Sequence, residues 1–244
     1  MALSPLNCIA LRTVKVSDSR NLLSVWTRQH GRLTLAMPAG NTPEARRRKA
    51  LTVPLAVFDC IADVRPGKDI ISVRDITAAP LSLAVAGSPV KNLTAMFLAE
   101  LLDLLLKRSD ADERLSDFLF YSLETLALLD GSAAVANFHL VFLFRLAWYA
   151  GIAPDLSGWH RHAVFDLREG AMRNSLPLHH DFIAGRELSA LMALSRADYS
   201  SAARLPFGRN ERNRALDFIL DYYSMHLTSL SSLKSLDVLR MMLE

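Results

Sequence analysis

The sequence contains very little cysteine, with only Cys8 and Cys60 in 244 residues. So few thiols exclude a disulfide-rich secreted scaffold and a multi-cysteine zinc or iron–sulfur site. Both cysteines lie among apolar neighbours in segments that are typical of strands. We therefore expect two inert thiols in a hydrophobic core.

The sequence also lacks the short motifs of common enzyme classes. It contains no GxxxxGK[ST] phosphate loop, no GxGxxG after a strand, no GxSxG and no HExxH. We therefore predict a protein that is not an enzyme and that carries no cofactor and no metal. Disorder is excluded as well, because 51% of the residues are hydrophobic and 22% are charged.

A secretory signal and a membrane span are not expected either. The first residues have no basic region followed by an apolar one, which favours a cytoplasmic protein. The most apolar stretch, residues 133–153, carries Asn137, His139 and Arg145 near its middle. An arginine at mid-span is costly, so this stretch is interpreted as a buried core helix.

The charge that is present is unevenly distributed. Residues 1–80 contain 12 Lys and Arg against 6 Asp and Glu, a net charge of +6, whereas residues 81–244 contain 16 against 19, a net charge of −3. Together they give the overall +3. A basic N-terminal third is typical of a module that binds a polyanion such as nucleic acid, although a solvated basic surface would look the same.

Hydrophobic periodicity changes at the same place. The first 80 residues read as five strands with no clear helix between the first four, which predicts an α+β protein that begins with a small OB-like β-barrel. The predicted strands are residues 7–16, 21–28, 33–37, 51–64 and 69–78. Pro54 inside the fourth favours an edge or bulged strand.

Beyond residue 87 the apolar spacing is helical. Residues 81–87 are predicted to be a linker, and 88–244 an all-α domain that contains an irregular segment, 155–185. The expected helices are residues 88–108, 110–129, 132–150, 186–196, 210–227 and 232–243.

The sharpest local feature is a run of four cations in the connection between the third and fourth strands. We expect this connection, residues 38–50, to be a mobile, solvated loop that contacts phosphates. The predicted nucleic-acid contacts are Arg46, Arg47, Arg48 and Lys49, with Arg12, Lys15, Arg20, Arg28 and Arg32 on nearby strands and turns. Trp26 is either a base-stacking platform or a core residue, since its neighbours do not fix its face.

Four histidines form a candidate metal cluster in the irregular segment. His160, His162, His179 and His180 could bind zinc, or serve a hydrolase, but their spacing matches no zinc module. Ordinary loop histidines are the alternative that we prefer.

Six sequence blocks, in order along the chain, resemble the RecO family of bacterial recombination mediators, the last of them in two parts. The blocks are residues 9–18 (IALRTVKVSD), 26–33 (WTRQHGRL), 97–102 (FLAELL), 128–130 (LLD) with 137–146 (NFHLVFLFRL), 165–170 (FDLREG), 222–227 (YYSMHL) and 233–239 (LKSLDVL). Many members carry four zinc-binding cysteines after the third helix. Residues 151–185 contain none, so the chain resembles the zinc-free, Bacteroidetes-like branch.

The resemblance implies a DNA repair and recombination mediator. Such a protein binds single- and double-stranded DNA, anneals strands, and helps load RecA onto DNA coated by single-strand-binding protein, in a RecFOR-type pathway at the nucleoid. The implied partners are DNA, RecR, the C-terminal tail of single-strand-binding protein and, indirectly, RecA. Arg145 is a candidate rim residue for that tail, with a structural role as its alternative. An adaptor that binds proteins and has an incidental basic surface is the competing hypothesis.

Overall fold

A computed structural model describes residues 3–40, 42–65, 67–79, 81–107 and 109–242. The chain divides into two compact units, residues 1–128 and 129–244. Among the described residues, none of the helices combines the length and the apolar character that a membrane span needs.

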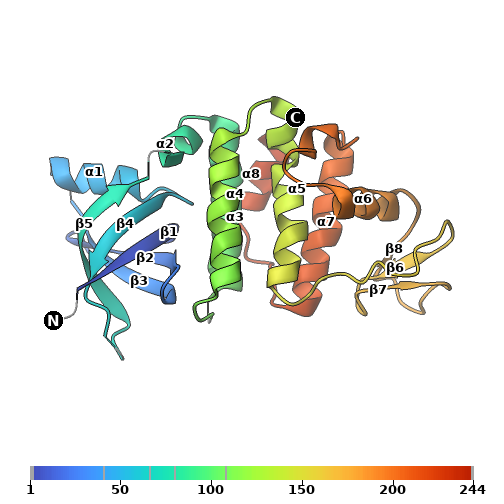
Figure 1. Ribbon diagram of the computed structural model, residues 1–244, viewed down its shortest axis with the longest axis horizontal. Coiled ribbons are helices and arrows are strands. Elements are labelled where there is room, and N and C mark those ends of the chain that lie inside the picture. Colours follow the sequence, from blue (N-terminus) through green and yellow to red (C-terminus); the bar gives the residue numbers. More distant parts are fainter. Residues whose placement is uncertain (1–2, 41, 66, 80, 108, 243–244) are drawn as a thin grey trace. The chain divides into compact units, whose positions relative to one another are not determined.

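The first unit begins with a closed five-stranded barrel, which confirms the predicted OB-like fold (Figure 1). Its strands are β1 (Ser4–Lys15), β2 (Arg20–Thr27), β3 (Gly31–Pro38), β4 (Val57–Ala62) and β5 (Ile70–Ala78). Antiparallel pairs join β1 to β2, β2 to β3, β1 to β4 and β4 to β5. A parallel pairing of β3 with β5 closes the barrel. Closure removes the exposed edges that an open sheet would present.

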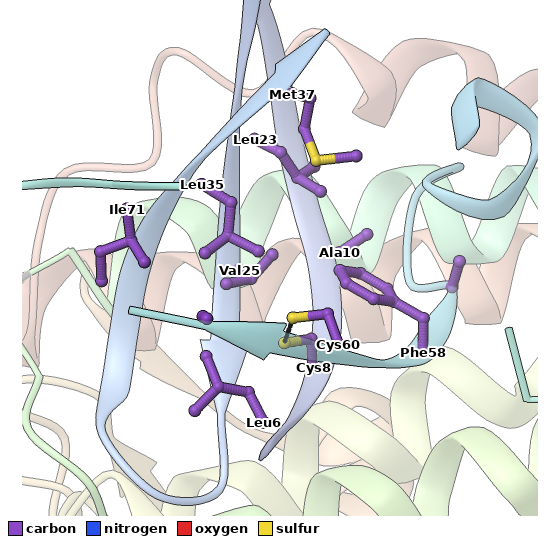
Figure 2. Packing of buried hydrophobic residues seen from close by; sticks show 12 residues of the cluster. Leu6, Cys8, Ala10, Leu23, Val25, Leu35, Met37, Phe58, Cys60 and Ile71 are labelled. Atoms are coloured by element: carbon purple, nitrogen blue, oxygen red, sulfur yellow. Dashed lines mark hydrogen bonds between the residues drawn. The ribbon is translucent and has the colours of Figure 1, made fainter. Parts of the chain in front are cut away.

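Alternate residues of the strands fill the barrel (Figure 2). The two cysteines belong to this core, as predicted, and their sulfur atoms lie 3.7 Å apart. Phe58 is the largest side chain of this cluster, and Leu6, Val25 and Leu35 also belong to it.

The connection that holds the four cations is helical, so the prediction of a mobile loop is wrong. Helix α1 spans Pro43–Leu51. Thr42 caps it by accepting a hydrogen bond from the Ala45 amide at 3.1 Å, and Pro43 occupies the first turn. Arginine and lysine are good helix formers, and neighbours in the sequence do not face each other on a helix, so their repulsion does not melt it.

The predicted fourth strand also begins too early. Pro54 lies before β4 rather than inside it. The segment between α1 and β4 is attached to β1, because Leu55 donates to the Ala10 carbonyl and Ala10 donates to that of Ala56, at 2.8 and 2.9 Å. A proline thus sits where no ladder hydrogen bond is needed.

Three helices complete the first unit. They are α2 (Leu81–Ala86), which occupies the predicted linker, α3 (Pro89–Leu105) and α4 (Glu113–Leu128). The buried Lys91 ammonium donates to the Ala127 carbonyl at 2.8 Å and joins α3 to α4. The compact unit of the barrel therefore extends well beyond residue 80.

The second unit is mainly helical. Its helices are α5 (Ser132–Tyr149), α6 (Gly185–Arg196), the 3₁₀ turn η1 (Ala202–Arg204), α7 (Arg209–His226) and α8 (Ser235–Met242). As predicted, α5 is a buried core helix. Polar groups of α5 form hydrogen bonds with other elements of the second unit. Tyr223 donates to the Leu143 carbonyl at 2.7 Å, and Asn137 donates to the Ala202 carbonyl at 2.9 Å.

The segment predicted to be irregular contains a small sheet. Its strands are β6 (Val164–Asp166), β7 (Ala171–Arg173) and β8 (Phe182–Ile183), in the order β7-β6-β8. They are only two or three residues long, too short for periodicity to reveal them.

Candidate nucleic-acid interface

A groove of about 260 Å³ lies at one mouth of the barrel, beneath α1. Thr13 of β1 and Asn21 of β2 contribute polar groups to it, and Arg48 and Lys49 of α1 contribute cations. The other described residues of its lining are mainly apolar, and they are Met37, Pro38, Ala39, Gly40, Ala45, Thr52, Val53 and Pro54.

Hydrogen bonds fix the walls of this groove. The Ala39 amide donates to the Ser19 carbonyl at 2.9 Å, which ties the end of β3 to the β1–β2 turn. The Thr52 hydroxyl donates to the Arg48 carbonyl at 3.1 Å and closes the last turn of α1. The groove is therefore a built feature between well-connected elements.

Several predicted cations gather around this mouth. Lys15 lies directly opposite Asn21 in the register of β1 and β2, so the two side chains share a face. Arg20 begins β2 opposite Pro38. Arg46 and Lys49 are exposed on α1, and Arg48 is half-buried. The side chain of Arg47 lies outside the described residues.

Three other predicted cations face acidic residues of the helices in the same unit. Arg32 pairs with Asp103 of α3 at 2.7 Å, and Arg12 approaches the same carboxylate at 3.8 Å. Arg28 pairs with Asp117 of α4 and lies over the Phe120 ring, 5.0 Å from its centroid. The charge of these three arginines is thus already partly balanced within the protein.

Trp26 is a core residue and not a base-stacking platform, the two interpretations that the sequence left open. It is fully buried, and its indole nitrogen donates to the Ser116 hydroxyl of α4 at 3.0 Å. A buried indole with a satisfied N–H offers no face to a base. No local sequence signal could have shown this, because its partner is 90 residues away.

Sequence reasoning left out the cations of the β4–β5 turn. Arg65 and Lys68 lie there, at 2.7 and 3.9 Å from Asp63. The hydrogen bond from Arg65 lowers the pKa of Asp63. The loop between the fourth and fifth strands is one of the usual ligand-binding loops of OB folds, which is the signal that would have included them.

Arg145 of α5 has a structural contact in the second unit. Its guanidinium donates to the Ala197 carbonyl at 2.9 Å, and the side chain is half-buried. Hydrogen bonds from Ser200 and Ser201, with a smaller contribution from the Arg145 charge, lower the pKa of Asp198 to about 2. The structural alternative for Arg145 therefore has direct support, and its role toward a partner stays a prediction.

The four histidines of residues 160–180 lie in ordinary polar contacts or in solvent. His160 is hydrogen-bonded to Asn174 at 2.8 Å, and His162 donates its amide to the His160 ring at 3.2 Å. His180 is exposed. Within the described residues, no group of three or more His, Cys, Asp or Glu side chains could hold a metal ion.

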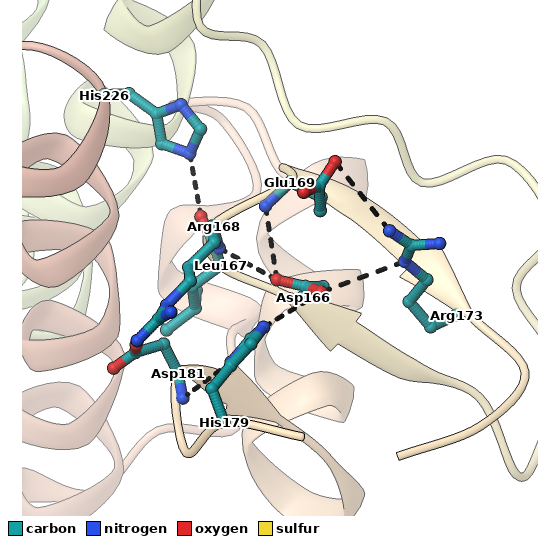
Figure 3. Close-up of polar contacts among 8 residues, drawn as sticks. All are labelled: Asp166, Leu167, Arg168, Glu169, Arg173, His179, Asp181 and His226. Carbon is teal, nitrogen blue, oxygen red and sulfur yellow. Dashed lines mark hydrogen bonds and ion pairs between the residues drawn. The ribbon is translucent and has the colours of Figure 1, made fainter. Parts of the chain in front are cut away.

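His179 instead contributes to a polar network around Asp166 (Figure 3). The buried Asp166 carboxylate accepts the amides of Arg168 and Glu169 at 3.0 and 3.2 Å, and its other oxygen lies 3.4 Å from the His179 ring. Arg173 stands 3.8 Å from the same carboxylate. This network ties β6 to the turns on either side of it, and it gives the histidine a structural partner.

Comparison with known proteins identifies the family. The family model described as "Recombination protein O C terminal" matches residues 87–237. The chain is 31% identical over 232 residues to the DNA repair protein RecO of Phocaeicola vulgatus, with 95% of each chain covered. The proteins of that name from Bacteroides fragilis and Porphyromonas gingivalis are also 31% identical, over 233 and 235 residues, again with 95% or more of each chain covered. This chain belongs to the RecO family.

Proposed function

We propose that this protein is a DNA repair and recombination mediator whose barrel binds the DNA backbone. It binds single and double strands, promotes annealing, and works with RecR to help load RecA onto DNA coated by single-strand-binding protein. It acts without catalysis, at the nucleoid. The observation that carries the proposal is a closed OB-like barrel with cations around one mouth, in a chain whose relatives are named DNA repair protein RecO.

The physical argument rests on phosphate charge. Each phosphate that a lysine or arginine neutralises releases counterions, which supplies affinity without regard to sequence. The exposed cations near the groove are suited to this task because they stand on two strands and a helix of fixed geometry. They are Lys15, Arg20, Arg46 and Lys49, joined by the half-buried Arg48.

Annealing follows from the same surface. Two complementary strands repel each other, and a basic surface that holds one strand screens its charge from the other. This needs neither a nucleophile nor a nucleotide pocket. Arg12, Arg28 and Arg32 contribute less in this proposal, because carboxylates of helices in the same unit already face them. Lys15 is more exposed, and it exchanges its 2.7 Å contact with the exposed Asp18 for a phosphate.

The experiment is a titration of fluorescent single and double strands of several sequences across a salt series. We compare the wild type with a variant carrying Arg46→Ala, Arg48→Ala and Lys49→Ala. Loss of three phosphate contacts should weaken binding of all sequences alike and reduce the salt slope by about 2 on single strands.

The control variant removes the same charge from exposed arginines of the second unit, through Arg186→Ala, Arg204→Ala and Arg214→Ala. It should bind almost as the wild type does. An equal loss of DNA affinity in both variants would show that binding depends on net charge and not on the position of the cations. Absence of binding by the wild type would favour the adaptor hypothesis.

A further inference from the structure

The groove at the barrel mouth has the chemistry of a site for one nucleotide, beyond simple phosphate attraction. Its volume, about 260 Å³, equals the space of roughly nine water molecules at about 30 Å³ each. It is smaller than the roughly 300–1,000 Å³ of pockets for drug-sized ligands. A flat ring system attached to one sugar phosphate is a ligand of suitable size.

The arrangement of polar and apolar groups is that of an amphipathic ligand. Met37 and Ala45 are buried in the wall, and Pro38, Val53 and Pro54 extend its apolar surface. Such side chains pack against the faces of a base. Asn21 and Thr13 offer hydrogen-bond donors and acceptors that suit the edge of a base.

Among the described residues that line the groove itself, the cations stand on the α1 side, while Lys15 and Arg20 lie outside its lining. Arg48 and Lys49 both come from α1, whereas the strand side of the groove is lined by neutral groups. A phosphate is therefore attracted to the helix side, while its base points toward the barrel. Cations on one side and apolar side chains on the other suit a nucleotide. A free anion would not need the apolar wall.

We infer that this groove binds one unstacked nucleotide of a single DNA strand, with the base on the apolar wall and the phosphate on Arg48 and Lys49. The inference rests on the proposed function and adds a preference for single strands. A paired base lies inside the duplex and must be unpaired and unstacked to enter, which costs a few kcal/mol. Duplex DNA therefore binds through the exposed cations alone.

The test uses three probes of equal length, about 16 nucleotides, at one salt concentration. They are an oligothymidylate, the same backbone with abasic positions throughout, and a duplex. The groove is filled by Ala39→Leu from the β3 side and, independently, by Thr13→Leu from the β1 side. Leucine occupies the space without adding an aromatic ring that could itself stack. Ala84→Leu, at an exposed position of α2 outside the groove lining, is the matched control.

Both groove-filling variants should bind oligothymidylate about fivefold more weakly or worse, which is the effect of about 1 kcal/mol per stacked base. Their affinity for the abasic strand and the duplex should stay at the level of the Ala84→Leu control. Unchanged oligothymidylate binding, or an equal loss on all three probes, would overturn the nucleotide site and leave the phosphate-binding proposal standing. A wild type that binds none of the probes would overturn both.

Discussion

Arg32 of β3 and Asp103 of α3 form an ion pair of 2.7 Å between Nη2 and Oδ1, and both side chains are largely buried. The same guanidinium donates to the Asp103 carbonyl at 2.7 Å and to the Ser24 hydroxyl at 2.9 Å. One arginine thus connects two strands of the barrel to a helix about 70 residues away in the sequence.

We expect Asp103→Ala to lower the free energy of unfolding by about 3 kcal/mol, because it leaves a largely buried guanidinium uncompensated. Asp117→Ala is the matched control, since it breaks the exposed Arg28–Asp117 pair and should cost at most about 1 kcal/mol. Urea denaturation followed by circular dichroism measures both. Equal losses would show that burial does not determine how much these two ion pairs contribute to the free energy of unfolding.

The buried indole of Trp26 gives a spectroscopic prediction. A variant with Trp148→Phe and Trp159→Phe retains Trp26 as its single tryptophan, because the chain contains three. Its emission should be blue-shifted and quenched little by acrylamide. Saturating single-stranded DNA should leave that emission unchanged. Quenching by DNA would contradict the core role and restore the stacking platform.

His139 makes the stability of the second unit depend on pH. Burial, with the charge of Arg212 as a smaller cause, lowers its pKa from 6.5 to about 3. The unfolded chain therefore binds a proton between those values that the folded chain does not, so stability falls as the pH drops below about 6.5. From about pH 7.5 to about pH 5 the loss from this residue is about 2 kcal/mol.

The measurement compares wild type and His139→Gln in urea at the two pH values. All other titrating groups are shared, so the wild type should lose about 2 kcal/mol more than the variant on acidification. An identical loss in both proteins would show that His139 titrates normally in the fold.

The two core thiols should be inert. The hydrogen bond between them and their burial raise the pKa of the Cys8 thiol, and both side chains are almost fully enclosed. A disulfide-exchange reagent at about pH 8 should modify no thiol in the folded protein and two thiols in denaturant. Cys60→Ala should show one thiol in denaturant. Rapid modification of the folded wild type would indicate that the barrel opens readily.

The barrel was predictable because several of its strands alternate and two of its hairpin connections carry glycine, at Gly31 and Gly67. Gly31 is subject to two constraints, of which the sequence reveals one. Its position in a hairpin turn is readable from the sequence, and its φ is +66°. Its second constraint is not readable: a Cβ there would lie 2.5 Å from the backbone carbon of Asp110, which is distant in sequence. A side chain is excluded both by conformation and by a tertiary contact.

The candidate site was predicted in its residue types and only partly in its geometry. Charge alone could not separate Lys15, which lies at the barrel mouth, from Arg32, which is held by a carboxylate of α3. Repulsion between adjacent cations predicts a loop at residues 43–51, yet this segment is helical. Thr42 and Pro43 form a helix start signal that outweighs the repulsion.

The dependence of the barrel on later residues has a consequence for synthesis of the chain. Ser116, which receives the Trp26 hydrogen bond, leaves the ribosome 90 residues after Trp26 does. At about 5–20 residues per second, that delay is roughly 5–18 s. A nascent chain that has completed β5 can pair its strands. Trp26 nevertheless stays exposed to water, and Arg32 lacks its ion pair, until α3 and α4 emerge. The shortest product that matures is therefore the whole first unit, and a fragment ending after the last barrel strand will be prone to aggregate.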